Sequence, residues 1–260
     1  MQIKDYLDDI ARSTGFLSRL PMPASRFAGH DGTLSRAAGM FPVAGLVIAL
    51  GPCLLVVLLS GLNANAALTI LIAMCAMTGV TGALHEDGLA DSADALGARG
   101  GREHMLEIMK DSRIGTYGVL ALVAGFALRG VALTILLSVS GGWNTALLML
   151  AVAAASRTAM VWHWSQLPAA RQGGVAASAG APDDSALTHA LLCGGILFAL
   201  FVTLASGPAA ALLGLAVIAV AARQWTNLVR SRLHGHTGDT LGATQQITET
   251  LCLTALALLA

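Results

Sequence analysis

The sequence predicts an all-α protein whose helices cross a membrane several times. Of its 260 residues, 55% are hydrophobic and only 12% are charged, whereas a soluble domain usually has roughly 25% charged residues. Apolar stretches of about 20 residues recur along the chain, which is the length of helix that crosses about 30 Å of hydrocarbon. Membrane-spanning strands would instead show short segments of alternating hydrophobicity. These observations predict a polytopic helical bundle that forms a single domain over residues 1–260.

About seven spans are expected, preceded by a segment of a different kind. In residues 1–36, the apolar residues Ile3, Leu7 and Ile10 follow one another at three- and four-residue steps, with charged residues largely on the other face. This pattern predicts an amphipathic helix that lies in the membrane interface. The spans are then expected at Ala37–Leu59, Ala64–Leu84, Ile114–Val139, Trp143–Trp164, Leu187–Ser206, Pro208–Leu228 and Leu241–Ala260.

Charged residues are expected on one side of the membrane. All lysines and arginines except Arg129 and Arg157 lie in the N-terminal segment or in residues 85–113, 165–186 and 223–240, and the remaining connections are short and uncharged. Because loops rich in Lys and Arg stay in the cytoplasm, the N-terminus and the charged loops are predicted to be cytoplasmic. The net charge is zero, so nothing indicates a nucleic-acid partner.

The acidic residues follow the same distribution, and Glu249 lies near the inner end of its predicted span. A transporter usually needs polar groups at mid-depth or on both faces of the membrane. An enzyme that acts on cytoplasmic substrates does not. The asymmetry therefore favours an enzyme whose catalytic segment is the cytoplasmic stretch 85–113.

The most informative stretch is His85-Glu-Asp-Gly-Leu-Ala-Asp-Ser-Ala-Asp94. Asp87, Asp91 and Asp94 are spaced i, i+4, i+7, which places them on one face of a helix, where like charges repel. No lysine or arginine occurs in residues 84–98 to pair with them. Mg²⁺ binds such carboxylates together with water and substrate phosphates; the alternatives are a solvated acidic helix end or a cation-transport path. The candidate metal ligands are Glu86, Asp87, Asp91 and Asp94.

Three other charged positions are candidates for holding a phosphorylated substrate. Lys110 and Arg113 precede a predicted span, where they either bind phosphate oxygens or anchor the helix by snorkelling. Arg157 lies within a span, where an arginine is costly and usually paired or functional, and we expect it to reach an anionic substrate. Asp239, in the polar block 235–243, is either part of a helix cap or a phosphate and metal contact.

Four blocks of the chain make it resemble the cobalamin synthase family, the adenosylcobinamide-GDP ribazoletransferases. They occur in the order typical of that family, and the second and third are long and specific. The blocks are Phe16-Leu-Ser-Arg-Leu-Pro-Met-Pro23, His85-Glu-Asp-Gly-Leu-Ala-Asp-Ser-Ala-Asp94, Ile108-Met-Lys-Asp-Ser-Arg-Ile-Gly-Thr-Tyr-Gly118 and Thr237-Gly-Asp-Thr-Leu-Gly-Ala243. The resemblance implies a Mg²⁺-dependent enzyme of the bacterial inner membrane. Such an enzyme joins adenosylcobinamide-GDP to α-ribazole or its 5′-phosphate and releases GMP.

In that reaction the ribazole hydroxyl would attack a phosphorus of the activated corrin. We expect Asp94 to accept the hydroxyl proton, with Asp111 and Asp239 as rivals. The candidates for stabilising phosphate charge are Lys110, Arg113 and Arg157. Two other interpretations are considered, a membrane transporter and a lipid enzyme of the CDP-alcohol phosphotransferase type. The second rests on the short likeness of Asp87-Gly-Leu-Ala-Asp91 to a motif of that class.

Overall fold

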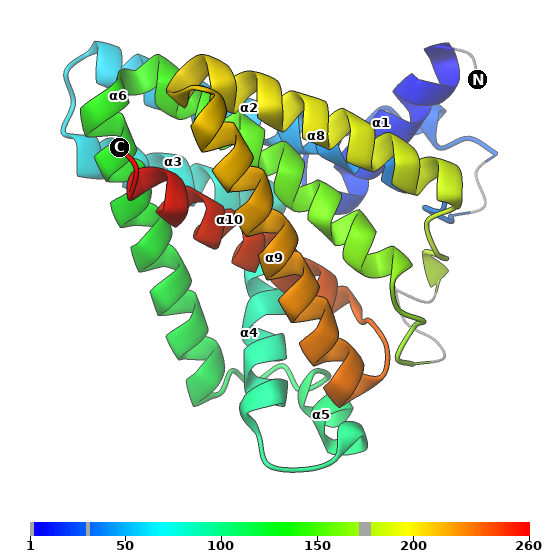
Figure 1. Ribbon diagram of the computed structural model, residues 1–260. Helices are drawn as coiled ribbons and strands as arrows, with labels where there is room; N and C mark the ends of the chain where they lie inside the picture. The colour runs from blue at the N-terminus through cyan, green and yellow to red at the C-terminus, as the bar shows by residue number, and fades with distance from the viewer. Residues whose placement is uncertain (1–2, 30–31, 172–177) are drawn as a thin grey trace.

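The computed structural model describes residues 3–29, 32–171 and 178–260, and in these ranges the chain is helical and contains no β-strand. The prediction of an all-α fold is confirmed. Figure 1 shows the helices as two splayed groups joined around a central helix, α10. In chain order the elements are α1 (Ile3–Leu17), the 3-10 turns η1 (Ala24–Arg26) and η2 (Ala37–Met40), α2 (Phe41–Gly61), α3 (Ala66–Thr81), α4 (Leu84–Gly97), α5 (Arg102–Ile108), α6 (Thr116–Ser165), α8 (Asp184–Ser206), α9 (Pro208–Leu233) and α10 (Gly238–Ala257).

Four helical segments are long and apolar enough to cross a membrane: Ala37–Gly61, Thr116–Ser165, Asp184–Ser206 and Pro208–Leu233. Helices α3 and α4 meet at a bend of 87° and only together form a fifth candidate, either a broken span or a re-entrant loop. The chain is thus a multi-pass membrane protein, as predicted. The expected number of seven spans is not confirmed.

The difference in span count has local causes. Both predicted spans between Ile114 and Trp164 lie in α6, whose 50 residues would extend about 75 Å at 1.5 Å per residue. Gly141 interrupts this helix with φ 77° and ψ 172°, a conformation that residues with a Cβ rarely adopt. Figure 1 shows the two halves of α6 running in different directions. Helix α3, by contrast, has only 16 residues, too few to cross alone.

The last predicted span, Leu241–Ala260, corresponds to α10, which is not among the apolar candidates. This helix packs against α4, α6 and α9, and Thr237 begins it with a capping box closed by Thr240. Its first three turns bury polar side chains against these neighbours. The buried polar residues are Thr240, Thr244, Gln245, Gln246 and Thr248. The first three turns of α10 are therefore covered by protein, which explains why its sequence is less apolar than that of the other long helices.

Helix α1 packs on α2 and η2. Asp9 is buried on this side and accepts two hydrogen bonds from Arg36, of 2.8 and 2.9 Å. Ile3 and Leu7 remain exposed, as residues facing a membrane interface would be. Residues 1–2 and 30–31 of the predicted interfacial segment lie outside the described ranges, and the placement of this segment in the interface stays a prediction.

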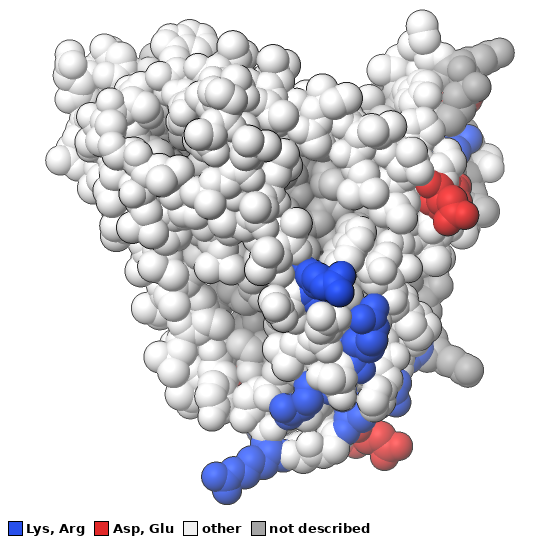
Figure 2. All heavy atoms as spheres, in the orientation of Figure 1, with Lys and Arg blue, Asp and Glu red and all other residues white. Residues whose placement is uncertain are grey.

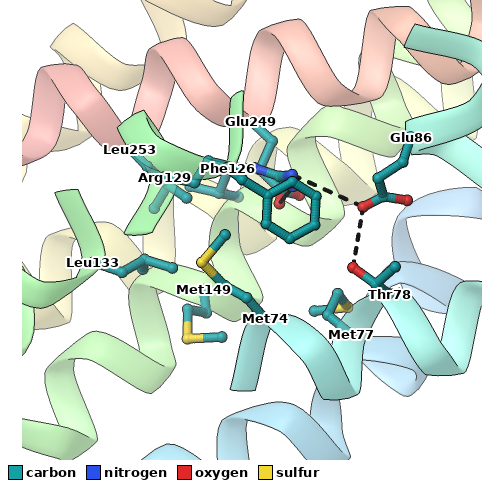
Figure 3. A pocket seen from close by; sticks show the side chains of 11 residues that line it. Met74, Met77, Thr78, Glu86, Phe126, Arg129, Leu133, Met149, Glu249 and Leu253 are labelled. Atoms are coloured by element: carbon teal, nitrogen blue, oxygen red, sulfur yellow. Dashed lines mark hydrogen bonds and ion pairs between the residues drawn. The ribbon is translucent and has the colours of Figure 1, made fainter. Parts of the chain in front are cut away.

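A buried group of ion pairs joins the helices at the centre of the bundle. Glu249 of α10 lies 3.2 Å from Nη1 of Arg129 and 3.8 Å from Nη1 of Arg157. The two arginines come from different halves of α6, on either side of Gly141. Arg129 also lies 3.9 Å from Glu86, the third residue of α4. We call Glu86, Arg129, Arg157 and Glu249 the core ion network; Figure 3 shows Glu86, Arg129 and Glu249 converging beside a cavity.

Amide and hydroxyl side chains complete the core ion network. Gln245 donates to Glu249 at 2.5 Å, and Gln246 donates to Oε1 of Glu86 at 3.1 Å. Oε2 of Glu86 has no hydrogen-bond partner among the described residues. The adjoining cavity, of about 30 Å³, is large enough for a water molecule. The network is thus neutral in formal charge, with two acids and two arginines held away from lipid.

Replacing Arg129 with alanine should leave Glu86 and Glu249 buried without one of their cationic partners. Removing one member of a buried ion pair typically costs about 3–5 kcal/mol. We therefore expect R129A to lower the free energy of unfolding by an amount in that range. Thermal and denaturant unfolding of the protein in detergent measures the loss, with the exposed Glu107→Ala as the control. Equal stability of the two variants would contradict the structural role of the network.

Candidate active site

The acidic motif forms α4, which begins after a sharp bend. Gly82 and Ala83 both have positive φ, 64° and 59°, and they turn the chain by 87° from α3 into α4. Helix α4 buries His85, Gly88 and Ser92 against its neighbours. Asp87 is exposed, and Asp91 and Asp94 are half-buried. The predicted helical stripe of aspartates is therefore present, at the side of α4 that is less covered by protein.

Helix α4 crosses α10 at two glycines. An ideal Cβ placed on Gly88 would lie 2.7 Å from the carbonyl oxygen of Asp239, and one placed on Gly242 would lie 3.2 Å from Cα of His85. The absence of side chains at both positions lets the two backbones approach closely. Because of this contact, Asp239 joins the stripe, and the charges of Asp87, Asp239 and Asp94 all act on Asp91.

Asp239 lies in the first turn of α10, outside the apolar spans, and is half-buried. Its Oδ2 accepts a hydrogen bond of 3.2 Å from the Thr237 hydroxyl and lies 3.6 Å from Arg171. Burial raises the pKa of the Asp239 carboxyl, and the Thr237 hydroxyl and the Arg171 charge only partly oppose this effect. A raised pKa makes the ionised form a stronger base than an ordinary aspartate.

Asp94 caps a neighbouring helix. Its two carboxylate oxygens accept hydrogen bonds from the backbone N–H groups of Gly115, at 2.7 Å, and Gly118, at 2.8 Å. These are the N-cap and a first-turn residue of α6, whose N–H groups have no partner within the helix. Both glycines stand directly against the Asp94 carboxylate, with no room for a Cβ. Asp94 is on the predicted face of α4, but its oxygens hold α6 in place.

The predicted phosphate-binding segment is the loop between α5 and α6. Lys110 is exposed there, and Arg113 donates to Asp111 through both Nε and Nη2. The Arg113 guanidinium lowers the pKa of Asp111 to about 2. Asp111 is consequently a weak base. The Asp94 cap on α6 attaches this loop to the same side of the molecule as the aspartate stripe.

Two predicted site residues lie in the core rather than with the stripe. Glu86 is buried and turns toward Arg129 and Gln246, although it precedes Asp87 in the motif. Arg157 is also fully buried, and its charged partner is Glu249. Arg157 was expected to reach an anionic substrate, whereas the structure buries its side chain and pairs it with Glu249 of α10. Both residues belong to the core ion network.

Arg171 is a residue of the site that the sequence alone did not indicate, whereas Thr237 belongs to the polar block 235–243, which was expected at a helix start. Arg171 is the single basic residue in the stretch 165–186. Its isolation in an otherwise uncharged or acidic loop is the one feature of the sequence that could have indicated a role in the site. Nearby, Arg102 donates to the carbonyl oxygens of Leu233 and Ala170, which ties α5 to the end of α9. These contacts hold the end of α9 and the segment that carries Arg171 against α5.

Among the described residues, no three His, Cys, Asp or Glu side chains converge as a preformed metal site. Mg²⁺ does not require one, because it is usually bound by one or two carboxylates and completes its shell with water and substrate phosphates. Asp87 and Asp91 are the accessible carboxylates of the stripe, and no hydrogen bond or ion pair within the described chain engages them. Their donor chemistry fits Mg²⁺, and the metal itself stays a prediction.

Figure 2 shows lysines and arginines gathered on the lower part of the molecule, over the end of α9 and the region of α5. The upper left of this face carries none, and a smaller group of charged residues lies at the upper right, in the region of α1. Fold and site thus define a polytopic helical membrane protein with polar, carboxylate-rich chemistry at one end of its bundle. Such a site is suited to an enzyme that acts on charged, water-soluble substrates.

The chain belongs to the cobalamin-5-phosphate synthase family, whose model matches residues 9–257. It is 49% identical to the adenosylcobinamide-GDP ribazoletransferase of Sinorhizobium medicae over 99% of this chain and 98% of that protein. The protein of the same name from Rhizobium johnstonii is 50% identical over 99% of this chain and its own full length. No solved structure matches significantly. The chain is accordingly a transferase of cobalamin synthesis, and the transporter interpretation is not supported.

A methyl group at Gly88 should separate α4 from α10, because the added Cβ meets backbone atoms of Asp239 that cannot rotate away. We expect G88A to lower kcat at least tenfold by displacing Asp87 and Asp91 from Asp239. The matched control is Gly79→Ala in α3, where a Cβ meets nothing within 4 Å. Turnover and thermal stability of both variants would be measured. Wild-type turnover in folded G88A would show that the close crossing is unimportant.

Proposed function

We propose that this protein joins adenosylcobinamide-GDP to α-ribazole or its 5′-phosphate and releases GMP. The proposal takes its substrates from the names of the relatives and its chemistry from the site. The observation that carries it is the close crossing of α4 and α10, where Gly88 lies against the backbone of Asp239 and the charges of Asp87 and Asp239 act on Asp91. Acidic residues of two helices lie on this side of the molecule. Among the described residues, the one cation paired with them is Arg171, which lies beside Asp239. A diphosphate substrate with a divalent cation balances this excess of negative charge.

Asp87 and Asp91 are the residues that we propose to hold Mg²⁺. When bound, the metal would neutralise charge on the diphosphate of the activated corrin. Glu86 and Asp94, the other two candidate ligands, are engaged elsewhere, in the core ion network and at the start of α6. Two carboxylates are the usual protein contribution for Mg²⁺ bound with phosphates. The proposed ligand set is therefore smaller than the one suggested by the motif alone.

In the proposed transfer, the hydroxyl oxygen of the ribazole forms a bond to the phosphorus that bears cobinamide. The bond from that phosphorus to the GMP oxygen breaks, and the electron pair leaves with GMP. Such transfers depend mainly on positioning and charge stabilisation. Lys110, exposed in the α5–α6 loop, and Arg171, beside Asp239, are the cations that we propose for the phosphate oxygens. Arg113 shares its charge with Asp111.

Asp239 is the acid that we propose to accept the hydroxyl proton. Its two rivals have other partners in the structure. Both oxygens of Asp94 accept backbone hydrogen bonds, and the low pKa of Asp111, about 2, makes it a poor proton acceptor. Asp239 lies beside the stripe and is attached to the chain through Thr237. Its carboxylate is the one of the three that combines proximity to Asp91 with a raised pKa.

We place the protein in the bacterial inner membrane, with its N-terminus and active site in the cytoplasm. The distribution of lysine and arginine supports this orientation, since such residues mark the cytoplasmic side. A lipid enzyme of the CDP-alcohol phosphotransferase type is the remaining alternative. It rests on the motif Asp87–Asp91 alone, whereas the family relation extends over nearly the whole chain.

Replacing Asp91 with asparagine should reduce GMP release by at least 100-fold and leave the protein folded, since its carboxylate has no structural hydrogen bond among the described residues. Asp94→Ala should instead lower the free energy of unfolding by about 1–2 kcal/mol, the typical cost of losing a helix cap. Both variants would be assayed with adenosylcobinamide-GDP and α-ribazole and compared by thermal unfolding. Near-wild-type turnover of purified D91N would refute its assignment as a metal ligand.

Removal of divalent cations should abolish GMP release, because the repulsion among the carboxylates and the substrate diphosphate would then be uncompensated. The measurement is turnover of detergent-solubilised protein in excess EDTA, followed by a titration with Mg²⁺. Activity should return with Mg²⁺ and stay absent with Na⁺ at equal ionic strength. Full turnover in excess EDTA would refute the proposed role of the metal, and it would leave the proposed substrates unaffected.

A further inference from the structure

A groove of about 360 Å³ opens on the side of the bundle between α6, α8 and α9. Small residues form much of its wall, including Ala159, Gly194 and Ala219. An ideal Cβ placed on Gly195, in the same wall, meets no heavy atom within 4 Å, so this backbone faces open space. All three helices belong to the apolar spans. The groove therefore faces lipid, and its occupant is apolar along most of its length.

One charged residue, Arg223, lines this groove. It is the sixteenth residue of α9, which places it about 22 Å along the helix axis from Pro208, toward the boundary of a hydrocarbon layer about 30 Å thick. Among the described residues, Arg223 forms no hydrogen bond or ion pair. Arg129 and Arg157, in the two halves of α6, both pair with Glu249. An exposed arginine at this boundary is able to pair with a lipid phosphate, since the described chain supplies it with no anion.

We propose that this groove binds an anionic phospholipid, with an acyl chain against Gly195 and Ala219 and its phosphate on Arg223. A phospholipid matches the site because one molecule supplies both an apolar chain and a phosphate at the membrane boundary. Basic pockets between membrane helices on the positively charged side bind anionic headgroups in this way. The site is separate from the aspartate stripe, and it stands whether or not the proposed transferase substrates are correct.

Trp162 lines the groove and reports on its occupancy. Lipids with brominated acyl chains would be titrated onto full-length, delipidated protein in detergent, and the quenching of Trp162 fluorescence obtained by subtracting the signal of Trp162→Phe. Phosphatidylglycerol and phosphatidylcholine with the same chains are the two probes. The variants are Arg223→Gln, which removes the charge, and Gly195→Leu, which fills the groove. Their matched controls are Arg232→Gln, at an exposed site of the same helix, and Gly51→Leu, where a Cβ also meets nothing within 4 Å.

In the wild type, phosphatidylglycerol should bind about fivefold more tightly than phosphatidylcholine, the ratio expected for one arginine near the membrane surface. Arg223→Gln should bring this ratio to about one, and Gly195→Leu should abolish the Trp162 quenching by both lipids. The two control variants should behave as the wild type does.

Three results would overturn the proposal. The first is an unchanged lipid ratio in Arg223→Gln, and the second is undiminished quenching in Gly195→Leu. The third is displacement of phosphatidylglycerol by GDP, which would make the groove part of a nucleotide site. Because Arg223 is exposed and forms no hydrogen bond or ion pair among the described residues, the lipid ratio of Arg223→Gln decides the matter even if Gly195→Leu fails to fold.

Discussion

The pairing of charges inside the bundle is the constraint on which the rest of this structure depends. An arginine or a glutamate is costly in a membrane interior unless it has a partner. Glu249 meets this requirement for both Arg129 and Arg157, at 3.2 and 3.8 Å. The pairs fix α10 between the two halves of α6. Buried ion pairs of this kind contribute little net stability but penalise other arrangements, because every alternative leaves a charge unpaired.

The position of α10 in turn determines the site. With α10 at the centre, the glycine crossing at Gly88 and Gly242 brings α4 against its first turn. Asp239 then stands beside Asp87 and Asp91, although it lies far from them in the sequence. The polar first turns of α10, which protein covers, and the acidic site at the start of this helix are thus two consequences of one packing arrangement.

The side chains of the four acids in the motif lie in three different environments. Successive residues on an α-helix differ by about 100° in direction, so Glu86 faces the core while Asp87 faces outward. Asp94 lies on the same side as Asp91 but reaches the start of α6, where it caps Gly115 and Gly118. One short motif therefore supplies a core ion pair, the proposed metal ligands and a helix cap. All three tasks restrict the same helix to one position.

The sequence by itself determined the membrane class and the helical stripe of Asp87 and Asp91, because each depends on local composition or periodicity. It did not determine the number of spans. The direction of α6 changes at Gly141, and the polar character of α10 reflects the helices that pack against it. Nor did the sequence show that Arg157 is buried and paired with Glu249 of α10, or that the Asp94 carboxylate accepts hydrogen bonds from the start of α6. Periodicity sets which side of a helix a residue is on, but what packs against that side is decided by segments distant in the chain.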